Sequence, residues 1–401
     1  YAGAVVIANF MGFDFWTSAL VLVVLTGIYT VVGGMRAVAY TEAVQAVVLL
    51  LGSVVLTAIG LHELGGWNAM IEAAPKEKLN MFPPLNDPDF PWAGIVFASP
   101  IVGLWYWCTD QYIVQRCLAA SSEKEARRGT IFAAWLKLFP FFIFMIPGLI
   151  ATAMSASGKL QLESADQAFP ALVQALMPVG LRGLLAGGLL AALMSSLASV
   201  FNSCSTLFTM DIYRKLKPSG TDRELVTVGR IATAVVVGLG ILWIPVMSGI
   251  SGTLYQYLQS VQSYLAPPIA AVFLLGIFYK RINGTGAMVT LAGGFILGML
   301  RIFLELQKDS LTGFLHTFAT LNFLYFCIVL FVFCIVLLIV ASLFGPKPTE
   351  SQLAGLTFST VSDDDQQRTR SSWNATDVVL SLMVVVIIIA VFVYFSPLGV
   401  A

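Results

Sequence analysis

The chain has 401 residues, of which 58% are hydrophobic and only 11% are charged, and its 22 basic residues balance its 22 acidic ones. A soluble domain carries about 25% charged residues, so this composition, with a mean hydropathy of +0.86, indicates a helical protein that crosses a membrane several times. The zero net charge does not suggest a nucleic-acid role. The five cysteines form no CxxC pair, so neither a metal site nor a disulfide framework is indicated.

Ten apolar runs are long enough to span a bilayer. In chain order they lie at roughly 15–33, 38–62, 92–118, 129–153, 180–210, 227–248, 254–279, 285–305, 317–344 and 374–395. A shorter run at 1–10 precedes them, and the chain opens inside an apolar stretch without an initiator Met or a signal peptide. We therefore expect residues 1–10 to be the end of an earlier helix in a chain that lacks its N-terminal part. Residues 1–401 are expected to form a single transmembrane domain.

The distribution of Lys and Arg predicts which side of the membrane each connection faces. Fifteen basic residues lie in the connections after the first, third, fifth, seventh and ninth runs, and six lie on the other side. The richer side is expected to be cytoplasmic, which makes residues 345–372 a cytoplasmic loop and places the C-terminus outside. The acidic run 363–365 marks that loop as a flexible tether. The expected location is the cell membrane, inner or plasma.

Three polar features lie in the first four runs, where lipid alone would not tolerate them. Glu42 opens the second run and is either a carboxylate favoured by the helix dipole or an ion-coupling group near the inner mouth. Tyr106 and Trp107, shortly before Asp110, are either an interfacial aromatic belt or a stacking surface for a sugar ring. Lys137, in the fourth run, pairs with Asp110, contacts substrate oxygens or extends to the cytoplasmic interface.

The fifth run carries a row of hydroxyl and amide side chains whose spacing places them on one face of a helix. The row comprises Ser195, Ser199, Asn202, Thr206 and Thr209, with Ser196 beside it. A polar face on a spanning helix lies against protein or water rather than lipid. Hydroxyl oxygens and free carbonyls are hard ligands that suit Na⁺, whereas small residues also let two helices pack closely. The row by itself is consistent with either role.

Two glutamines, Gln259 and Gln262, share a face of the seventh run shortly before the pair Pro267-Pro268. Adjacent prolines remove two backbone donors, so we expect the helix to break there. Broken helices beside polar side chains are typical of the binding sites of secondary transporters. The alternative is a kinked helix that only packs.

Three strings carry a resemblance to a known family: WYWCTDQYIVQRCLAA at 105–120, LMSSLASVFNSCSTLFTMDIY at 193–213 and YLQSVQSYLAPPIAAVFLLGIF at 257–278. Over essentially its whole length the chain resembles the solute:sodium symporter family, and within it the sodium/glucose cotransporter branch. The short loop before a single final helix resembles bacterial members. The resemblance implies an all-α polytopic membrane protein with the LeuT-like core of two inverted repeats. The first core helices would be missing, and the C-terminal helices would be peripheral.

The resemblance also implies a role for each polar group named above. Na⁺ would be held by the Ala192 carbonyl and by the hydroxyls of Ser195 and Ser196. Substrate binding would involve Tyr106, Trp107, Lys137, Gln259 and Gln262, and gating or coupling would involve Glu42, Asp110 and Ser199. The implied function is Na⁺-coupled uptake of a glucose- or galactose-like sugar by alternating access. Na⁺, the sugar and the lipid bilayer would be the partners, with no nucleic acid and no enzymatic reaction.

Three positions depart from the family pattern. Glu42 stands where the family usually has Asp. Members with a second ion site have two hydroxyls at the positions of Ala198 and Ser199, and because Ala198 has no oxygen to offer, we predict one Na⁺ per sugar. Gly103 stands where glucose-selective relatives tend to have Thr, which leaves the particular sugar open.

Two other functions compete with sugar symport. A symporter for another small solute, such as an inositol, a sialic acid or an amino acid, would generally lack the combination of Tyr106, Lys137 and Gln259. A membrane sensor without transport would be favoured by fusion to a kinase domain, and no such domain follows the last run in this sequence.

Overall fold

The computed structural model describes residues 3–4, 7–8, 12–162, 164–248 and 253–401, with the side chains of 29, 31–43 and 246–248 outside that description. Within these ranges the chain contains helices and no strand. It forms two compact units. The first unit comprises Tyr1–Leu79, Leu136–Gly249 and Val400–Ala401, and the second comprises Asn80–Trp135 and Ile250–Gly399. Neither unit is a continuous stretch of sequence, and the single domain expected above stays a prediction.

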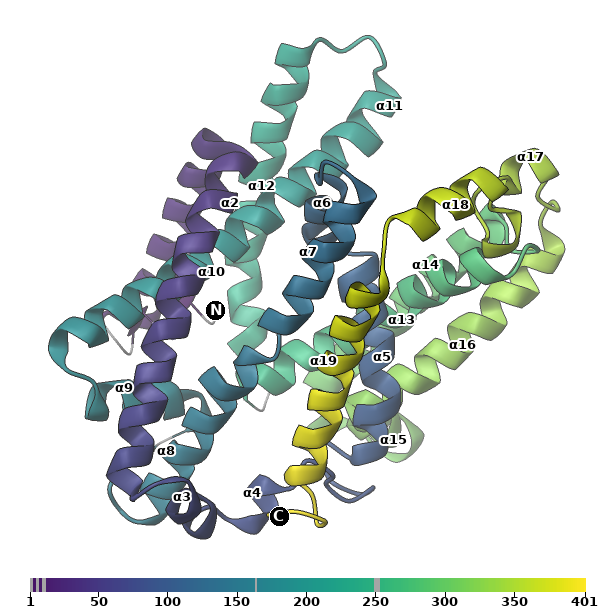
Figure 1. Cartoon of the computed structure of the whole chain (residues 1–401). Coiled ribbons are helices and arrows are strands. Elements are labelled where there is room, and N and C mark those ends of the chain that lie inside the picture. Colours follow the sequence, from purple (N-terminus) through teal and green to yellow (C-terminus); the bar gives the residue numbers. More distant parts are fainter. Residues whose placement is uncertain (1–2, 5–6, 9–11, 163, 249–252) are drawn as a thin grey trace. The chain divides into compact units, whose positions relative to one another are not determined.

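The first unit is built on the long helices α2, α10 and α12, which pack against one another (Figure 1). Shorter helices, with α8 and α9 among them, pack at one end of α2. Its elements are α2 Phe15–Leu64, α3 Trp67–Ala73, α4 Lys76–Leu79, the π-helix η1 Phe141–Met145, α8 Ile146–Ala156, the 3₁₀-helix η2 Ala165–Gln167, α9 Ala168–Leu176, α10 Val179–Leu207, the π-helix η3 Phe208–Tyr213, α11 Arg214–Leu216 and α12 Asp222–Ser248.

The second unit has its core where α5, α13, α14 and α16 pack together. Buried residues such as Ala98, Tyr264 and Cys327 meet there. Its elements are α5 Trp92–Cys108, α6 Gln111–Leu118, α7 Glu123–Leu136, α13 Leu254–Phe278, α14 Gly284–Leu306, η4 Lys308–Ser310, α15 Gly313–Thr320, α16 Phe323–Phe344, α17 Glu350–Leu353, η5 Phe358–Thr360, α18 Asp363–Ser371 and α19 Ala375–Tyr394. The last residue of α7 belongs to the first unit.

Among the described residues, eight helices are long and apolar enough to cross a membrane, or nine if the bent pair α5 and α6 is one span. Phe15–Ile28 is a shorter apolar helix. Each of the ten runs expected from the sequence is therefore mainly helical, although the third and fourth runs are each divided between helices. The first two, expected as separate spans, lie in the single 50-residue helix α2. At 1.5 Å per residue such a helix is about 75 Å long, more than twice the ~30 Å of a hydrocarbon core.

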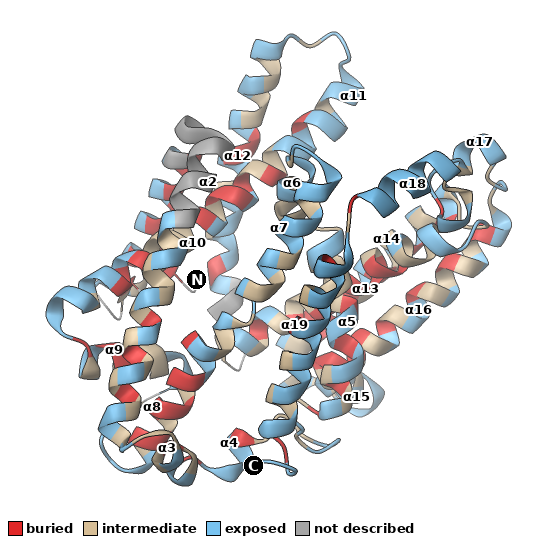
Figure 2. Ribbon diagram, in the orientation of Figure 1, coloured by how far each residue is buried: buried red, intermediate tan, exposed pale blue. Residues whose placement is uncertain are grey.

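Many residues along α16 and α19 are exposed, as Figure 2 shows, and most of the exposed ones are apolar. On α16 the exposed side chains Val329, Val332, Val336 and Val340 recur at helical spacing, so they form one stripe. In water this stripe would be an aggregation hazard. In a bilayer it faces lipid, and the backbone polar groups beneath it are satisfied within the helix.

The seventh run was expected to break at Pro267-Pro268, and this prediction is wrong. α13 is one helix from Leu254 to Phe278, with both prolines in its interior. Pro268 cannot donate a hydrogen bond to the Tyr264 carbonyl. α14 covers that carbonyl instead: Gly298 lies so close to the Tyr264 oxygen that any Cβ at position 298 would overlap it. The neighbouring helix thus shields the group that the proline leaves without its usual donor.

Gly298→Ala is expected to destabilise the fold by about 1–3 kcal/mol because the new methyl group would overlap the Tyr264 carbonyl. Gly276→Ala is the matched control, since a Cβ at Gly276 meets nothing within 4 Å and Ala favours the helix. Thermal unfolding of the detergent-solubilised protein compares the two. Equal melting temperatures for both variants would contradict the close approach of α14 to α13.

The third run, in contrast, does break. α5 ends at Cys108, and α6 begins at Gln111 after a bend of 50°. Asp110 caps α6 because its carboxylate accepts a hydrogen bond from the Tyr112 amide at 3.1 Å. The Thr109 hydroxyl donates to the Trp105 carbonyl at 2.7 Å and takes up an acceptor at the end of α5. Side chains that bond their own backbone in this way end helices without proline.

The loop at 345–372 is more ordered than the flexible tether expected. It contains α17, η5 and α18. Thr349 and Gln352 form a capping box at the start of α17. α18 has three Asp residues in its first turn and two Arg residues in its last turn, which suits the helix dipole.

Candidate functional site

The predicted Na⁺ ligands lie on α10 of the first unit, and the structure separates them by burial. Ser195 is 4% exposed, Ala192 is half-buried and Ser196 is exposed. Adjacent residues on a helix point about 100° apart, which is why Ser195 can be buried while Ser196 is exposed. Ser199, one turn after Ser195, is also buried. The buried pair Ser195 and Ser199, rather than the adjacent pair Ser195-Ser196, marks the inward face of α10.

Near the far end of the polar row, a neighbouring serine packs α10 against α12. The Ser205 hydroxyl donates to the Gly229 carbonyl of α12 at 2.7 Å. The Cβ of any larger residue at 229 would lie 3.1 Å from that hydroxyl oxygen and 3.5 Å from Thr209 Oγ1. Ser203, closer to Ser195, donates to the Ser199 carbonyl at 2.9 Å within α10. Ser205 and Gly229 thus let α10 and α12 approach closely, which supports the packing alternative at this end.

Beyond this packed end, the connection between α11 and α12 is tied by one carboxylate. Glu224 accepts hydrogen bonds from Tyr213 and Lys217. The pKa of Lys217 is raised above its usual value, mainly because its ammonium donates to Glu224 and, to a smaller extent, because the two charges attract. The contacts hold the last turns after α10 against the start of α12.

The aromatic segment lies at the end of α5 in the second unit, directly before the helix break. Tyr106 is half-buried, and its ring centroid lies 5.0 Å from that of Trp107 and 6.4 Å from that of Tyr112. Trp107 is 46% exposed. Because Asp110 caps α6, its carboxylate holds the break that positions these rings. An exposed ring beside a half-buried phenol can stack on the C–H face of a small polar solute.

The two predicted glutamines lie on α13 of the same unit, which packs against α5. Both are half-buried. The Gln259 side-chain amide donates to the Tyr255 hydroxyl at 2.8 Å, which leaves its carbonyl oxygen to accept from a ligand. Gln256 is committed elsewhere, since it forms a capping box with Thr253 at the start of α13. The arrangement therefore presents an oriented amide rather than a mobile one.

Lys137 was expected within the fourth spanning run, and the helix of that run is interrupted at this residue. α7 ends at Leu136, and Lys137 lies exposed in the turn that follows. Pro140 causes this interruption because it cannot donate to the Leu136 carbonyl. Lys137 belongs to the first unit and Asp110 to the second, so their pairing stays a prediction. The side chain of Glu42 lies outside the described residues.

A buried charged cluster on α14 was not predicted. Arg301 is 2% exposed, donates to the Leu321 carbonyl at 2.9 Å and lies 3.5 Å from a Glu305 carboxylate oxygen. The Tyr264 hydroxyl donates to the same carboxylate at 2.7 Å. The Arg-x-x-x-Glu spacing was an available signal, since it puts both charges on one face of a helix. The cluster links α13 to α14 within the second unit.

Comparisons with known proteins agree with this architecture. A model of the sodium:solute symporter family matches residues 1–294. The sodium/mannose cotransporter SLC5A10 of Bos taurus is 38% identical over 91% of this chain and 67% of its own length. Sodium/glucose cotransporter 1 of Ovis aries is 39% identical over 90% of this chain and 60% of its own. Sodium/glucose cotransporter 4 of Homo sapiens is 37% identical over 90% of this chain and 58% of its own length.

A solved structure has a similar fold. It is a substrate-bound outward-open state of a Na⁺-coupled sialic acid symporter, with a TM-score of 0.67 and 24% identity, covering 87% of this chain and 71% of the other. The protein is therefore an all-α, multi-pass membrane protein with the LeuT-like fold, as the sequence predicted. The chain belongs to the sodium:solute symporter family. It spans about 60% of the length of the sodium/glucose cotransporters that it matches.

Proposed function

We propose that the protein is a secondary active symporter that couples the inward movement of Na⁺ to the uptake of a sugar by alternating access. The observation that carries this proposal is the match to the symporter family over residues 1–294, together with relatives named as sodium/glucose and sodium/mannose cotransporters. Those relatives are transporters, so we assign no enzymatic reaction. Each Na⁺ that enters contributes about 2.3 kcal/mol per 100 mV of membrane potential, inside negative.

Within this proposal, Ser195 and the Ala192 carbonyl bind Na⁺, with Ser196 as a further ligand and Ser199 in the coupling network. The burial of Ser195 in a spanning helix supports the first of these roles, because a polar group buried there lies against protein rather than against lipid. Ala198 is fully buried and has no oxygen, which supports a ratio of one Na⁺ per sugar. Glu42 and Asp110 remain the proposed gating groups.

The proposed sugar contacts are the Tyr106 and Trp107 rings, the Lys137 ammonium and the Gln259 and Gln262 amides. The hydrogen bond from Gln259 to Tyr255 supports the contact with Gln259, since it orients that amide so that its carbonyl oxygen can accept from a sugar hydroxyl. We also propose that the basic connections are cytoplasmic, the C-terminus is outside and the membrane is the cell membrane, from the distribution of Lys and Arg.

Uptake into vesicles containing the full-length protein tests the function. A panel of labelled glucose, galactose, mannose, myo-inositol, sialic acid and proline is offered with and without a Na⁺ gradient. Saturable uptake of a hexose that stops without Na⁺ is expected. Hexose uptake that does not depend on Na⁺ would exclude coupling. Preferred uptake of another solute would mean that the chain belongs to a different branch of the family.

Position 103 is expected to tune the choice of sugar. Gly103 lies one turn before Trp107, and a Cβ there meets only Trp107 Cδ1, at 3.9 Å, so a larger side chain fits without strain. Gly103→Thr should change the ratio of apparent affinities for glucose and mannose by about two- to tenfold, the effect of one hydrogen bond. Gly103→Val, which has the same shape without the hydroxyl, is the control. The idea fails if both variants shift the ratio equally.

A further inference from the structure

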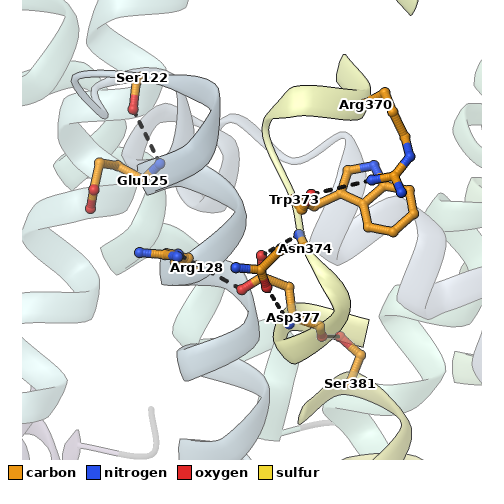
Figure 3. A network of polar contacts seen from close by, with 8 residues as sticks. All are labelled: Ser122, Glu125, Arg128, Arg370, Trp373, Asn374, Asp377 and Ser381. Atoms are coloured by element: carbon orange, nitrogen blue, oxygen red, sulfur yellow. Dashed lines mark hydrogen bonds and ion pairs between the residues drawn. The ribbon is translucent and has the colours of Figure 1, made fainter. Parts of the chain in front are cut away.

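A groove of about 600 Å³ lies between α7 and α19 in the second unit, away from the residues assigned above. Its upper wall carries Arg127 from α7 with Trp373 and Asp377 from the start of α19, and its lower wall is apolar, with Ile131, Val378 and Leu382. Figure 3 shows Asp377 facing Arg128 of α7 where the chain turns into α19, with the Trp373 ring beside Arg370. The groove thus has one polar end and one apolar end.

The carboxylate in the groove already has partners. Asp377 is 7% exposed, and one of its oxygens lies 3.7 Å from Nε of Arg128. The other oxygen accepts a hydrogen bond from the backbone N–H of Asn374 at 2.9 Å, and this bond is part of the capping box at the start of α19 (Figure 3). The negative charge of Asp377 is therefore offset by Arg128 and by the start of the helix.

The arginine in the groove has no such partner. Among the described residues Arg127 forms no ion pair, not even with Glu123 one helical turn before it. The Arg370 guanidinium stacks 4.0 Å from the Trp373 ring and adds a second positive charge beside the polar end. With Asp377 offset by Arg128, the groove presents a net positive charge.

The level at which the groove lies in the membrane favours a lipid as its ligand. The spans of α7 and α19 begin at Glu123 and Ala375, so Arg127 and Trp373 stand where both helices enter the bilayer. Trp residues favour this interfacial level. Ile131 and Leu382 lie one to two turns further along their helices, at the level of acyl chains.

We propose that this groove binds an anionic glycerophospholipid, with its phosphate on Arg127, its headgroup beside Trp373 and an acyl chain along Ile131, Val378 and Leu382. Charge complementarity selects the occupant, because the ammonium of a zwitterionic lipid adds a cation beside Arg127 and Arg370, and a soluble anion leaves the apolar wall exposed. Basic pockets between spanning helices bind anionic headgroups in this way. The site needs only the membrane-embedded fold, so it stands or falls independently of transport.

Native mass spectrometry of the full-length protein in a non-ionic detergent tests the site. The delipidated protein is titrated with phosphatidylglycerol, phosphatidylcholine and soluble glycerol 3-phosphate. We expect phosphatidylglycerol to bind about fivefold more tightly than phosphatidylcholine, which corresponds to one surface arginine, and glycerol 3-phosphate not to be retained. Equal binding of the two lipids, or retention of the soluble anion, overturns the proposal.

Matched variants assign the binding to this groove. Arg127→Gln should remove the preference for phosphatidylglycerol, whereas Lys124→Gln, which removes an exposed charge from the same helix outside the groove, should keep it. Leu382→Trp fills the apolar end and should weaken both lipids without changing their ratio. An unchanged preference in Arg127→Gln places the lipid elsewhere and overturns the assignment.

Discussion

The Ser195→Ala variant is expected to need about ten to a hundred times more Na⁺ for half-maximal sugar uptake than the unchanged protein. Ser195 is buried on α10, and its hydroxyl is the side-chain ligand that the structure supports best. Interactions of a neutral polar group with a charge contribute about 1.5–3 kcal/mol, which corresponds to this loss of affinity. The Na⁺ dependence of labelled sugar uptake into vesicles, at fixed membrane potential, measures the effect.

Ser203→Ala is the matched control for this experiment. Ser203 is as buried as Ser195, at 4% exposure, and lies on the same helix, but its hydroxyl donates to the Ser199 carbonyl within α10. A general loss of packing would therefore affect both variants alike. If the two variants show the same Na⁺ requirement and the same drop in melting temperature, the polar row is packing and the ion lies elsewhere.

The Gln259→Ala variant is expected to lower the apparent affinity for the sugar by about ten- to a hundredfold and to leave the Na⁺ requirement nearly unchanged. The Gln259 amide is held by the Tyr255 hydroxyl, so it is oriented before the sugar arrives. A site built to bond a hydroxyl loses much of its discrimination when that partner is removed. The concentration dependence of uptake, measured separately for sugar and for Na⁺, separates the two effects.

Gln256→Ala provides the comparison, because Gln256 lies on the same helix but uses its amide to cap α13. This variant should lose about 1 kcal/mol of stability and keep its sugar affinity. Loss of sugar affinity in Gln256→Ala as large as in Gln259→Ala would mean that the whole start of α13 matters, rather than the one amide. Tyr255→Phe should have a smaller effect than Gln259→Ala, since it removes only the hydrogen bond that orients the amide.

The class of protein could be predicted from the sequence because hydropathy is a local property. Each apolar run that was long enough to span a bilayer is mainly helical, and the three quoted strings identified the family that the comparisons confirm. The inward face of α10 was predicted in part, since helical spacing put Ser195 and Ser199 on one side. Burial of both residues agrees with that spacing.

The helix breaks could not be predicted in the same way. Two prolines suggested a break in α13, but Gly298 of α14 covers the carbonyl that Pro268 leaves without a donor, and this contact joins residues 34 positions apart. The break came instead at Thr109 and Asp110, where side chains bond the backbone. The dipeptide Thr-Asp was an available signal, since both residues favour helix ends over helix interiors.

By itself the sequence determined the membrane class, the family and the set of polar residues that do not belong in lipid. These follow from composition, spacing and motif, each of which acts within a few turns of chain. Only the tertiary structure decided which hydroxyls of the α10 row are buried and which pack on α12, and that Arg301 is enclosed with Glu305. Those outcomes depend on which neighbouring helix covers each face, because in a membrane a polar group is tolerated only where another part of the protein satisfies it.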